Sequence, residues 1–440
     1  MLKLYGKKNK KLTVDLSTVN ELKENDKILI ASNGKMKQID QDLVNIGGGG
    51  STPDGPTFND GKTRLFVTVA SVDLPTICVN LGCTVVGGVT IDWGDGSDTE
   101  VTTNTARTTY SHSYSAAGDY IIALEVTDGE LILEGVDDGS SIMQLTPYQN
   151  AIPYYGYVLK RVEIGGSVTN IGKYAFYGCY ALTSVAIPSS VTSIGDNAFY
   201  GCYALTSVAI PSSVTSIGDN VFSGCYAITS VAIPSRVTSI GDNAFADCYA
   251  LSSITIPSSV TSIGDNAFAG CYALSSITIP SSVTSIGDNA FADCYALTSV
   301  AIPSSVTSIG EHAFADCYAI TSVAIPSRVT SIGTNVFSGC PITSVTFREG
   351  ITSIGDYMFG GSNLTSITIP SSVTSIGEHA FADCQSLAAV HILSTTPPTI
   401  GKDAFSNILS GCKIYIPAGS LEAYSTATNW SNYVSMLVEE

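Results

Sequence analysis

The chain has 440 residues, of which 44% are apolar and 13% are charged, and its formal net charge is −18. This negative charge would repel phosphate groups, which argues against binding to DNA, RNA or anionic membrane surfaces. No apolar run reaches the roughly 18 residues that a membrane-spanning helix needs, so no membrane insertion is predicted. The length predicts several modules.

Residues 1–46 are predicted to form an N-terminal leader. Its basic start is followed by polar residues, so no secretory signal peptide is expected. Lys27–Ala31 and Lys35–Ile39 predict a hairpin with a turn at Asn33. One hairpin is too small to be stable alone, so the leader is expected to assemble with copies of itself or with a partner.

The strand, turn and strand pattern of this leader resembles a short segment near the N-terminus of phage tail-fibre and virion appendage proteins. That resemblance implies attachment to a virion through the leader. A generic hairpin is the alternative interpretation.

Residues 47–62 contain consecutive glycines and two prolines, which predict a flexible linker. Residues 63–130 then show short apolar runs separated by Gly, Asp and Ser, a pattern typical of a β-sandwich. The predicted strands are Leu65–Val69, Thr84–Val86, Val89–Trp93, Thr108–His112 and Tyr120–Val126.

Two phrases in this segment, Ile91-Asp-Trp-Gly-Asp-Gly-Ser97 and the stretch from Tyr110 to Tyr120, resemble the PKD domain. This is an immunoglobulin-like sandwich common in extracellular and virion proteins. The resemblance implies that Trp93 packs in the core, that Gly94 and Gly96 shape a tight turn, and that His112 and Tyr114 belong to the sheet.

Three aspartates crowd the same turn: Asp92, Asp95 and Asp98. Crowded carboxylates suit calcium, but an Asp before Gly also accepts backbone N–H bonds within a turn. We favour turn chemistry and predict no metal site.

Residues 131–157 are predicted to connect the sandwich to a solenoid and to close its open end. From 158 to 411 the sequence repeats every 23 residues or nearly so. The phenylalanine column shows this period: Phe176, Phe199, Phe222, Phe245, Phe268, Phe291, Phe314, Phe337, Phe359, Phe381 and Phe405. A fixed period of this length predicts stacked rungs that bury a continuous core.

Within one unit, Leu205–Ile210 has the alternation of a leucine-rich-repeat strand, and Val191–Ile194 predicts a second extended piece. Asp196 is placed to cap a single helical turn over Ala198–Cys202. Residues 158–440 closely resemble the BspA-like leucine-rich repeats (LRR_5 type) of bacterial surface proteins. The implied fold is mainly β, a leucine-rich-repeat solenoid preceded by the sandwich.

Residues 412–440 look like the C-terminal cap of that family. A helix is expected to start in Ser420–Tyr424, with Trp430 and Tyr433 covering the last rung.

Most of the cysteines recur at one repeat position, in a column that includes Cys179, Cys202, Cys225, Cys248, Cys271, Cys294, Cys317 and Cys340. Such a column predicts one small buried side chain per rung. Disulfides between adjacent rungs are geometrically conceivable, whereas zinc would need ligands at short spacing. We favour free buried thiols.

Function is sought in the columns that do not face inward. The tyrosine column follows the cysteines directly, where the family has a small polar residue: Tyr180, Tyr203, Tyr226, Tyr249, Tyr272, Tyr295 and Tyr318. Exposed rings at this spacing suit binding to glycans or protein surfaces. A self-stacked ladder that stiffens the turn is the structural alternative, and both can hold together.

Other columns are less distinctive. The first strand offers small residues such as Ser207 and Ala209, a uniform surface suited to a repetitive ligand. Arg236 and Arg328 replace Ser four rungs apart, which indicates a block duplication. An acidic column beginning at Asp196 is interpreted as capping and solvating.

Catalytic motifs and cofactor sites are not found, so the protein is predicted to be no enzyme and to need no cofactor. The leading hypothesis is an adhesin of a phage virion or tail fibre, whose solenoid contacts a cell-surface protein or glycan. The alternatives are a bacterial surface or secreted adhesin and a glycan-binding accessory module. A homo-oligomer is left open.

Overall fold

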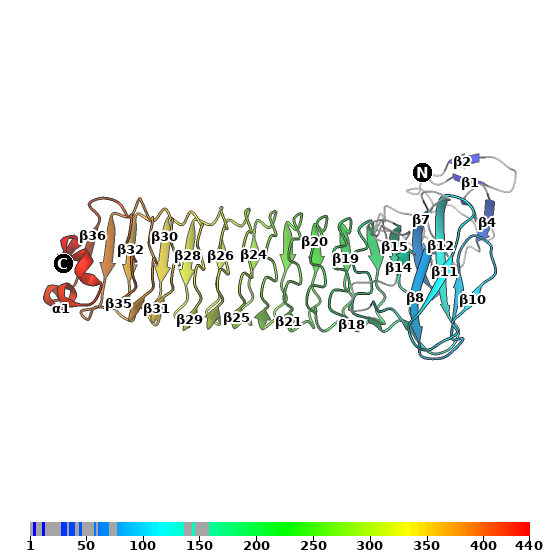
Figure 1. Cartoon of the computed structure of the whole chain (residues 1–440), viewed down its shortest axis with the longest axis horizontal. Coiled ribbons are helices and arrows are strands. Elements are labelled where there is room, and N and C mark those ends of the chain that lie inside the picture. The colour runs from blue at the N-terminus through cyan, green and yellow to red at the C-terminus, as the bar shows by residue number, and fades with distance from the viewer. Residues whose placement is uncertain are drawn as a thin grey trace.

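The computed structural model describes residues 60–69, 77–135 and 158–440, together with several short strands outside these ranges. The molecule is elongated: the sandwich lies at one end, the solenoid forms a long arm, and a helical cap closes the other end (Figure 1). Most of the linker predicted at 47–62 and most of the connector predicted at 131–157 lie outside the described residues.

Four strands of the leader form one sheet in the order β2-β1-β3-β4. Strands β3 and β4 pair antiparallel with Ser32 opposite Lys35, so the hairpin predicted around Asn33 is confirmed. Strands β5 and β6 pair separately. The bounds are β1 (Lys3–Tyr5), β2 (Lys11–Thr13), β3 (Ile28–Ser32), β4 (Lys35–Ile39), β5 (Val44–Asn45) and β6 (Thr57–Phe58).

The sandwich consists of two antiparallel layers. One layer has the order β10-β9-β12-β7, and the other contains β11, β8 and β13, with β14 also paired to β8. Side chains of both layers, including Leu65, Val79 and Ile122, share one buried core. The bounds are β7 (Thr63–Val69), β8 (Ile77–Cys83), β9 (Val89–Asp92), β10 (Glu100–Val101), β11 (Thr108–His112), β12 (Gly118–Val126), β13 (Leu131–Ile132) and β14 (Met143–Leu145).

Four of the five strands predicted here are confirmed, and the one at Thr84–Val86 is wrong. These residues form an exposed bend after β8, and the side chain of Val86 is 60% exposed. The true strand β8 is buried at every position, so it lacks the alternation of apolar and polar residues by which a half-exposed strand is identified.

The solenoid rungs carry two rows of parallel strands, and residues one repeat apart are paired. In the first row Ser207 lies opposite Ser230, and in the second row Ser262 lies opposite Ser285. The first row comprises β15 (Leu159–Glu163), β17 (Ser184–Ala186), β19 (Ser207–Ala209), β20 (Ser230–Ala232), β22 (Ser253–Thr255), β24 (Ile277–Thr278), β26 (Val300–Ala301), β28 (Ser322–Ile325), β30 (Ser344–Phe347), β32 (Ser366–Ile369), β34 (Ala389–Ile392), β36 (Lys413–Ile416) and β37 (Leu437–Glu439).

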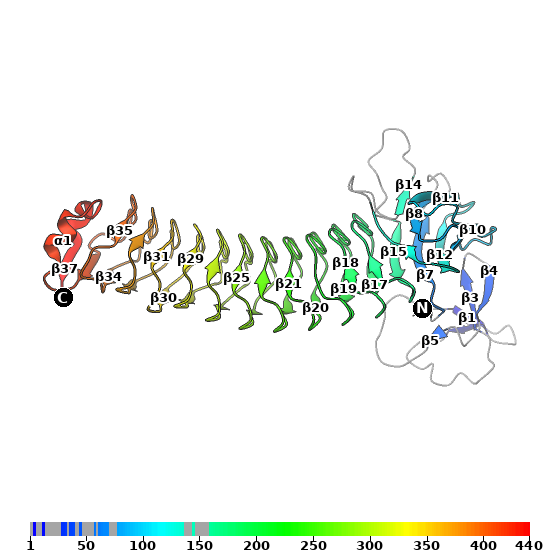
Figure 2. The same cartoon turned by 90° about the horizontal axis from the view of Figure 1, so that it is seen from below.

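The second row comprises β16 (Asn170–Ile171), β18 (Ser193–Ile194), β21 (Ser239–Ile240), β23 (Ser262–Ile263), β25 (Ser285–Ile286), β27 (Ser308–Ile309), β29 (Ser331–Ile332), β31 (Ser353–Ile354), β33 (Ser375–Ile376) and β35 (Thr399–Ile400). Both rows follow the arm along its whole length (Figures 1 and 2). The predicted leucine-rich-repeat solenoid is confirmed.

The third side of each rung, which we call the turn side, runs from the acidic column to the tyrosine column. The helical turn expected over Ala198–Cys202 is wrong, because Gly201 within it and Asn197 just before it have φ 70° and φ 58°, which a right-handed helix excludes. Asparagine tolerates this left-handed conformation better than most residues. Alternate N–H groups, such as that of Phe199 toward Val221 O at 3.0 Å, bond to the next rung instead.

Two inward columns fill the core of the solenoid. The phenylalanine rings stack at centroid distances of 5.2 to 5.8 Å, and Phe245 is fully buried. The twelve cysteines, all within the described ranges, are buried thiols that form no disulfide, so the prediction of buried thiols is confirmed. The Cys248 thiol donates to Phe222 O of the preceding rung at 3.3 Å, and burial raises the pKa of this thiol well above its ordinary value.

The sandwich and the solenoid share one sheet. Strand β7 pairs antiparallel with β15, so a nine-stranded sheet runs from β10 through β7 and β15 to β22 (Figure 2). On the second row, Leu133 bridges to Ile171, and its carbonyl accepts the N–H of Gly172 at 2.7 Å. Both rows of the first rung are therefore covered by segments from the sandwich side.

The shared edge buries a set of charged side chains. Arg64 pairs with Asp60 and Arg161 pairs with Glu163, while the Arg161 guanidinium lies 4.8 Å from the centre of the Phe66 ring. Burial raises the pKa of Glu163 although the Arg161 charge opposes this. Removing one partner would leave a buried charge uncompensated, which is costly.

The far end is closed as predicted. Helix α1 (Leu421–Thr426) and the 3-10 helix η4 (Trp430–Met436) cover the last rung. Trp430 is fully buried and donates its indole N–H to Pro398 O at 2.8 Å. Tyr433 packs edge-on against Phe405 at 5.7 Å between ring centres.

Candidate functional site

The tyrosine column forms a continuous ladder on the turn side. Neighbouring rings lie 4.5 to 5.0 Å apart between centroids and are 2° to 20° from parallel, so they stack face to face. Interior rings such as Tyr272 remain 38% exposed, and the last ring, Tyr318, is 55% exposed. The predicted self-stacked ladder is therefore present, and its edges also face solvent.

This geometry limits how the ladder can bind a ligand. Each interior ring has both faces against neighbouring tyrosines, so ligands meet ring edges and phenol oxygens rather than ring faces. Stacking of a sugar on a ring face is thereby restricted to the ends of the ladder. Ring edges and hydroxyl groups suit contact with a protein surface, where tyrosine supplies rigid area and a hydrogen bond.

Three carboxylates that were not among the predicted site residues lie beside the ladder. Asp247, Asp293 and Asp316 replace glycine two positions before the tyrosine of their rungs. Their φ angles are 57°, 60° and 56°, in the left-handed region that glycine occupies in the other rungs. The signal was available in the sequence as Ala-Asp-Cys-Tyr alternating with Gly-Cys-Tyr.

These carboxylates act on the tyrosine hydroxyl groups. Partial burial and the neighbouring Asp293 raise the pKa of Tyr295 to about 12. The Asp316 charge, followed by partial burial, raises the pKa of Tyr318. The Tyr295 and Tyr318 hydroxyl groups therefore stay protonated and can donate hydrogen bonds at neutral pH.

A second short tyrosine stack lies near the N-terminal end of the ladder. Tyr177 and Tyr200 stack at 4.9 Å, and the Tyr180 and Tyr203 hydroxyl groups contribute to raising the pKa of Tyr177, after burial and Tyr200. Later rungs have Ser, Ala or Gly at this position. The ladder is thus widest in its first two rungs.

The acidic column forms a second row on the turn side. The carboxylate of Asp242 accepts the backbone N–H of Asp265 in the next rung at 2.8 Å, and its neighbours repeat this bond. The bond joins successive rungs, so the predicted capping within one turn is replaced by capping between turns. Arg236 and Arg328 lie exposed on another part of their rungs.

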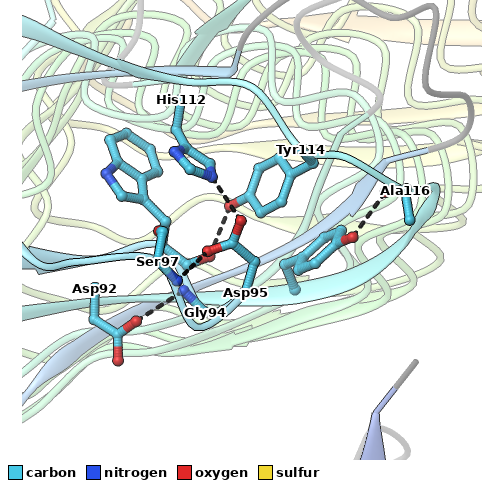
Figure 3. Close-up of polar contacts among 9 residues, drawn as sticks. Asp92, Gly94, Asp95, Ser97, His112, Tyr114 and Ala116 are labelled. Carbon is cyan, nitrogen blue, oxygen red and sulfur yellow. Dashed lines mark hydrogen bonds and ion pairs between the residues drawn. The ribbon is translucent and has the colours of Figure 1, made fainter. Parts of the chain in front are cut away.

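The sandwich holds the other cluster of ionisable side chains (Figure 3). His112 stacks on Trp93 at 5.1 Å, and its Nε2 bonds to the Asp95 carboxylate at 2.8 Å. The Tyr114 hydroxyl donates to Trp93 O at 2.8 Å. Trp93 is buried and Gly94 has φ 79°, as the sequence implied.

The aspartates of this turn act as turn acceptors. Asp92 accepts the N–H of Gly94, and Asp95 accepts the N–H of Ser97, each at 2.9 Å. Burial alone would raise the pKa of Asp95, but hydrogen bonds from Ser97 and His112 outweigh it and hold this pKa at about 2. Among the described residues no cluster of acidic, His or Cys side chains could hold a metal ion. We assign the cluster to the stability of the sandwich.

The sequence of the repeats matches a profile of known proteins. The profile for the BspA type leucine rich repeat region matches six copies over residues 151–272, 238–365 and 352–432, which together span more than half of the chain. The chain belongs to the BspA-type leucine-rich-repeat family.

Solved structures similar to this BspA-type chain come from bacteria. A leucine rich cell surface protein from Faecalibacterium prausnitzii A2-165 is 30% identical, and the match covers 80% of this chain and 97% of that chain, with a TM-score of 0.42. A leucine-rich repeat protein from Bacteroides ovatus ATCC 8483 is 26% identical, with coverages of 66% and 97% and a TM-score of 0.41.

The pneumococcal vaccine antigen PcpA is 16% identical to the BspA-type chain, with coverages of 67% and 80% and a TM-score of 0.38. Among curated proteins, none matches this sequence. In the described part of the chain, every helix is too short or too polar to cross a membrane.

Proposed function

We propose that this BspA-type protein is a non-enzymatic adhesin that recognises a cell-surface ligand through the tyrosine ladder. The observation that supports this proposal is the partial exposure of seven stacked tyrosines along one side of a rigid arm. Each ring is held by its neighbours, so little side-chain entropy is lost when a ligand binds. Because the ring faces are covered, a protein ligand is favoured over a glycan.

The other modules would place this surface at a distance from its anchor. The sandwich, which we propose to be PKD-like on account of its Trp93 turn and His112 contact, is a rigid base because it shares a sheet with the first rung. We propose that the leader attaches the arm to a phage virion, as a tail fibre. The β3-β4 hairpin on which that resemblance depends supports this assignment.

A bacterial cell-surface or secreted adhesin is the second candidate for the setting. It is favoured by the family of the repeats and by the description of the Faecalibacterium prausnitzii relative as a cell surface protein. Labelled protein incubated with intact bacteria and, separately, with immobilised animal matrix proteins tests the two settings. Binding to bacteria supports the virion assignment, and binding confined to matrix proteins would contradict it.

The role of the ladder is tested by changing Tyr203, Tyr226, Tyr249 and Tyr272 together to Ser. We expect binding to the recognised cells to weaken more than the Tm. The matched control changes the exposed serines of the first strand row in the same four rungs to Ala: Ser207, Ser230, Ser253 and Ser276. A large loss of Tm with unchanged binding, or an equal loss of binding in the control, would show that the ladder is structural.

A further inference from the structure

The charge of the solenoid is gathered on the turn side, in two rows. The outer row is the acidic column: Asp196, Asp219, Asp242, Asp265, Asp288, Glu311, Asp356 and Glu378. The inner row lies beside the tyrosine ladder at Asp247, Asp293 and Asp316, and Asp383 continues it beyond the end of the ladder. All of these side chains are exposed or half-buried.

Few basic side chains balance the negative charge of these two rows. The outer row has lysine at each end, Lys173 and Lys402, and Lys173 pairs with Asp196 at 2.9 Å. In the part of the chain that the structure describes, no basic side chain lies within ion-pair distance of any other carboxylate in the two rows. Carboxylates of the outer row, held about one rung apart, repel one another, so this row is a source of unfavourable free energy in the isolated protein.

The mutual repulsion is visible in the inner row. Burial and the Asp293 charge raise the pKa of Asp247, although Asp293 lies two rungs away. In the outer row, one carboxylate oxygen accepts a backbone N–H from the next rung, which fixes the side chain and leaves its second oxygen available. The outer row is therefore fixed in position before any partner arrives.

We propose that the turn side binds an extended, lysine- and arginine-rich polypeptide segment that lies along the axis of the solenoid, with its cations between the two acidic rows and its aliphatic stems against the tyrosine edges. This inference rests on the proposed function and names the chemistry of its ligand. Charge complementarity argues for such a partner. Guanidinium groups have five donors, which suits neighbouring carboxylate and phenol oxygens, and the stems of Lys and Arg pack on apolar surface.

The test uses the full-length protein and a fluorescein-labelled poly-L-arginine peptide, with binding followed by fluorescence anisotropy at several salt concentrations. The test variant changes the inner row: Asp247→Asn, Asp293→Asn and Asp316→Asn. Asparagine keeps the left-handed backbone that these positions require, so the fold is expected to be retained. The control variant has the same change in net charge but alters exposed carboxylates of the sandwich: Asp98→Asn, Asp128→Asn and Glu130→Gln.

We expect the inner-row variant to bind the peptide about tenfold more weakly, since three exposed ion pairs are lost, and the control to bind as the parent protein does. Binding should weaken as salt increases. An equal loss in both variants would mean general attraction by net charge and would overturn the proposal. Unchanged affinity of the inner-row variant would overturn it too.

Failure of this inference and failure of the proposed function can be distinguished, because the two variants are also compared for binding to cells. If the four-tyrosine variant loses cell binding while the inner-row variant keeps it, the cationic ligand is wrong and the adhesin stands. If the four-tyrosine variant keeps cell binding, the role of the ladder in the adhesin is wrong.

Discussion

The phenylalanine column and the tyrosine column pass through the same rungs, yet one is enclosed and the other faces solvent. In neighbouring rungs Phe245 and Phe268 stack at 5.5 Å and are fully buried, whereas Tyr249 and Tyr272 stack at 4.6 Å with their edges exposed. Stacking thus follows from the repeat itself, whatever the environment. Burial decides which column stabilises the fold and which is available for contact.

The largest expected loss of stability comes from creating a cavity in the phenylalanine column. Phe245→Ala should lower the free energy of unfolding by about 3–5 kcal/mol, because it leaves a cavity between two rungs. Tyr249→Ala in the same rung should cost less than about 1.5 kcal/mol, since the ring is partly in water already. Urea unfolding followed by circular dichroism compares the two, and equal losses would contradict the distinction between the columns.

A smaller loss of stability is expected when a hydroxyl group is added to the phenylalanine column, and less still when one is removed from the tyrosine column. Phe268→Tyr places a hydroxyl in an apolar core and should cost about 1–3 kcal/mol. Tyr272→Phe should stay within about 0.5 kcal/mol of the parent, as surface changes commonly do. Calorimetry of both variants measures this, and a Tyr272→Phe loss as large as that of Phe268→Tyr would show that ladder hydroxyl groups stabilise the rungs.

The smallest effect concerns alkaline pH. The pKa of Tyr295 is raised to about 12 from an ordinary value of 10, so its contribution to stability is fully present below pH 10 and is lost as the pH rises toward 12. Tyr295→Phe should therefore show a shallower fall of Tm over this pH range. Tyr415→Phe, outside the ladder, is the control. An identical fall of Tm with pH in the parent protein and in both variants would contradict the raised pKa of Tyr295.

The columns of the solenoid could be predicted because a fixed period assigns every residue of a rung at once. Phe245 and Cys248 can be placed in the core from position in the repeat alone, whereas Trp430 is placed over the last rung by the resemblance of residues 412–440 to the cap of the family. Asn197 was misjudged because an Asp-Asn pair also fits a helix start. The left-handed backbone there follows from hydrogen bonds to the next rung, which one unit does not contain.

The sandwich was less accessible to prediction, for a different reason. Strand β8 has no alternation because it is buried throughout, and the exposed Val86 interrupts an apparently apolar run. The pairing of β7 with β15 joins segments that share no motif. For the tyrosines, the repeat predicts the column but not the orientation of the rings, which depends on the distance between neighbouring rungs.

The shared sheet has a mechanical consequence. Its strands run across the long axis of the molecule (Figure 1). The hydrogen bonds between rungs are therefore arranged in series along the axis, and every rung boundary bears the full force of a pull on the tip of the arm. Adding rungs then increases reach without increasing breaking force, and the weakest rung boundary sets the load limit. At the β7–β15 boundary, the Arg161 guanidinium on the Phe66 ring and the hydrogen bond from Gly165 N–H to Thr63 Oγ1 add to the strand pairing, so we expect the arm to open within the repeats before it detaches from its base.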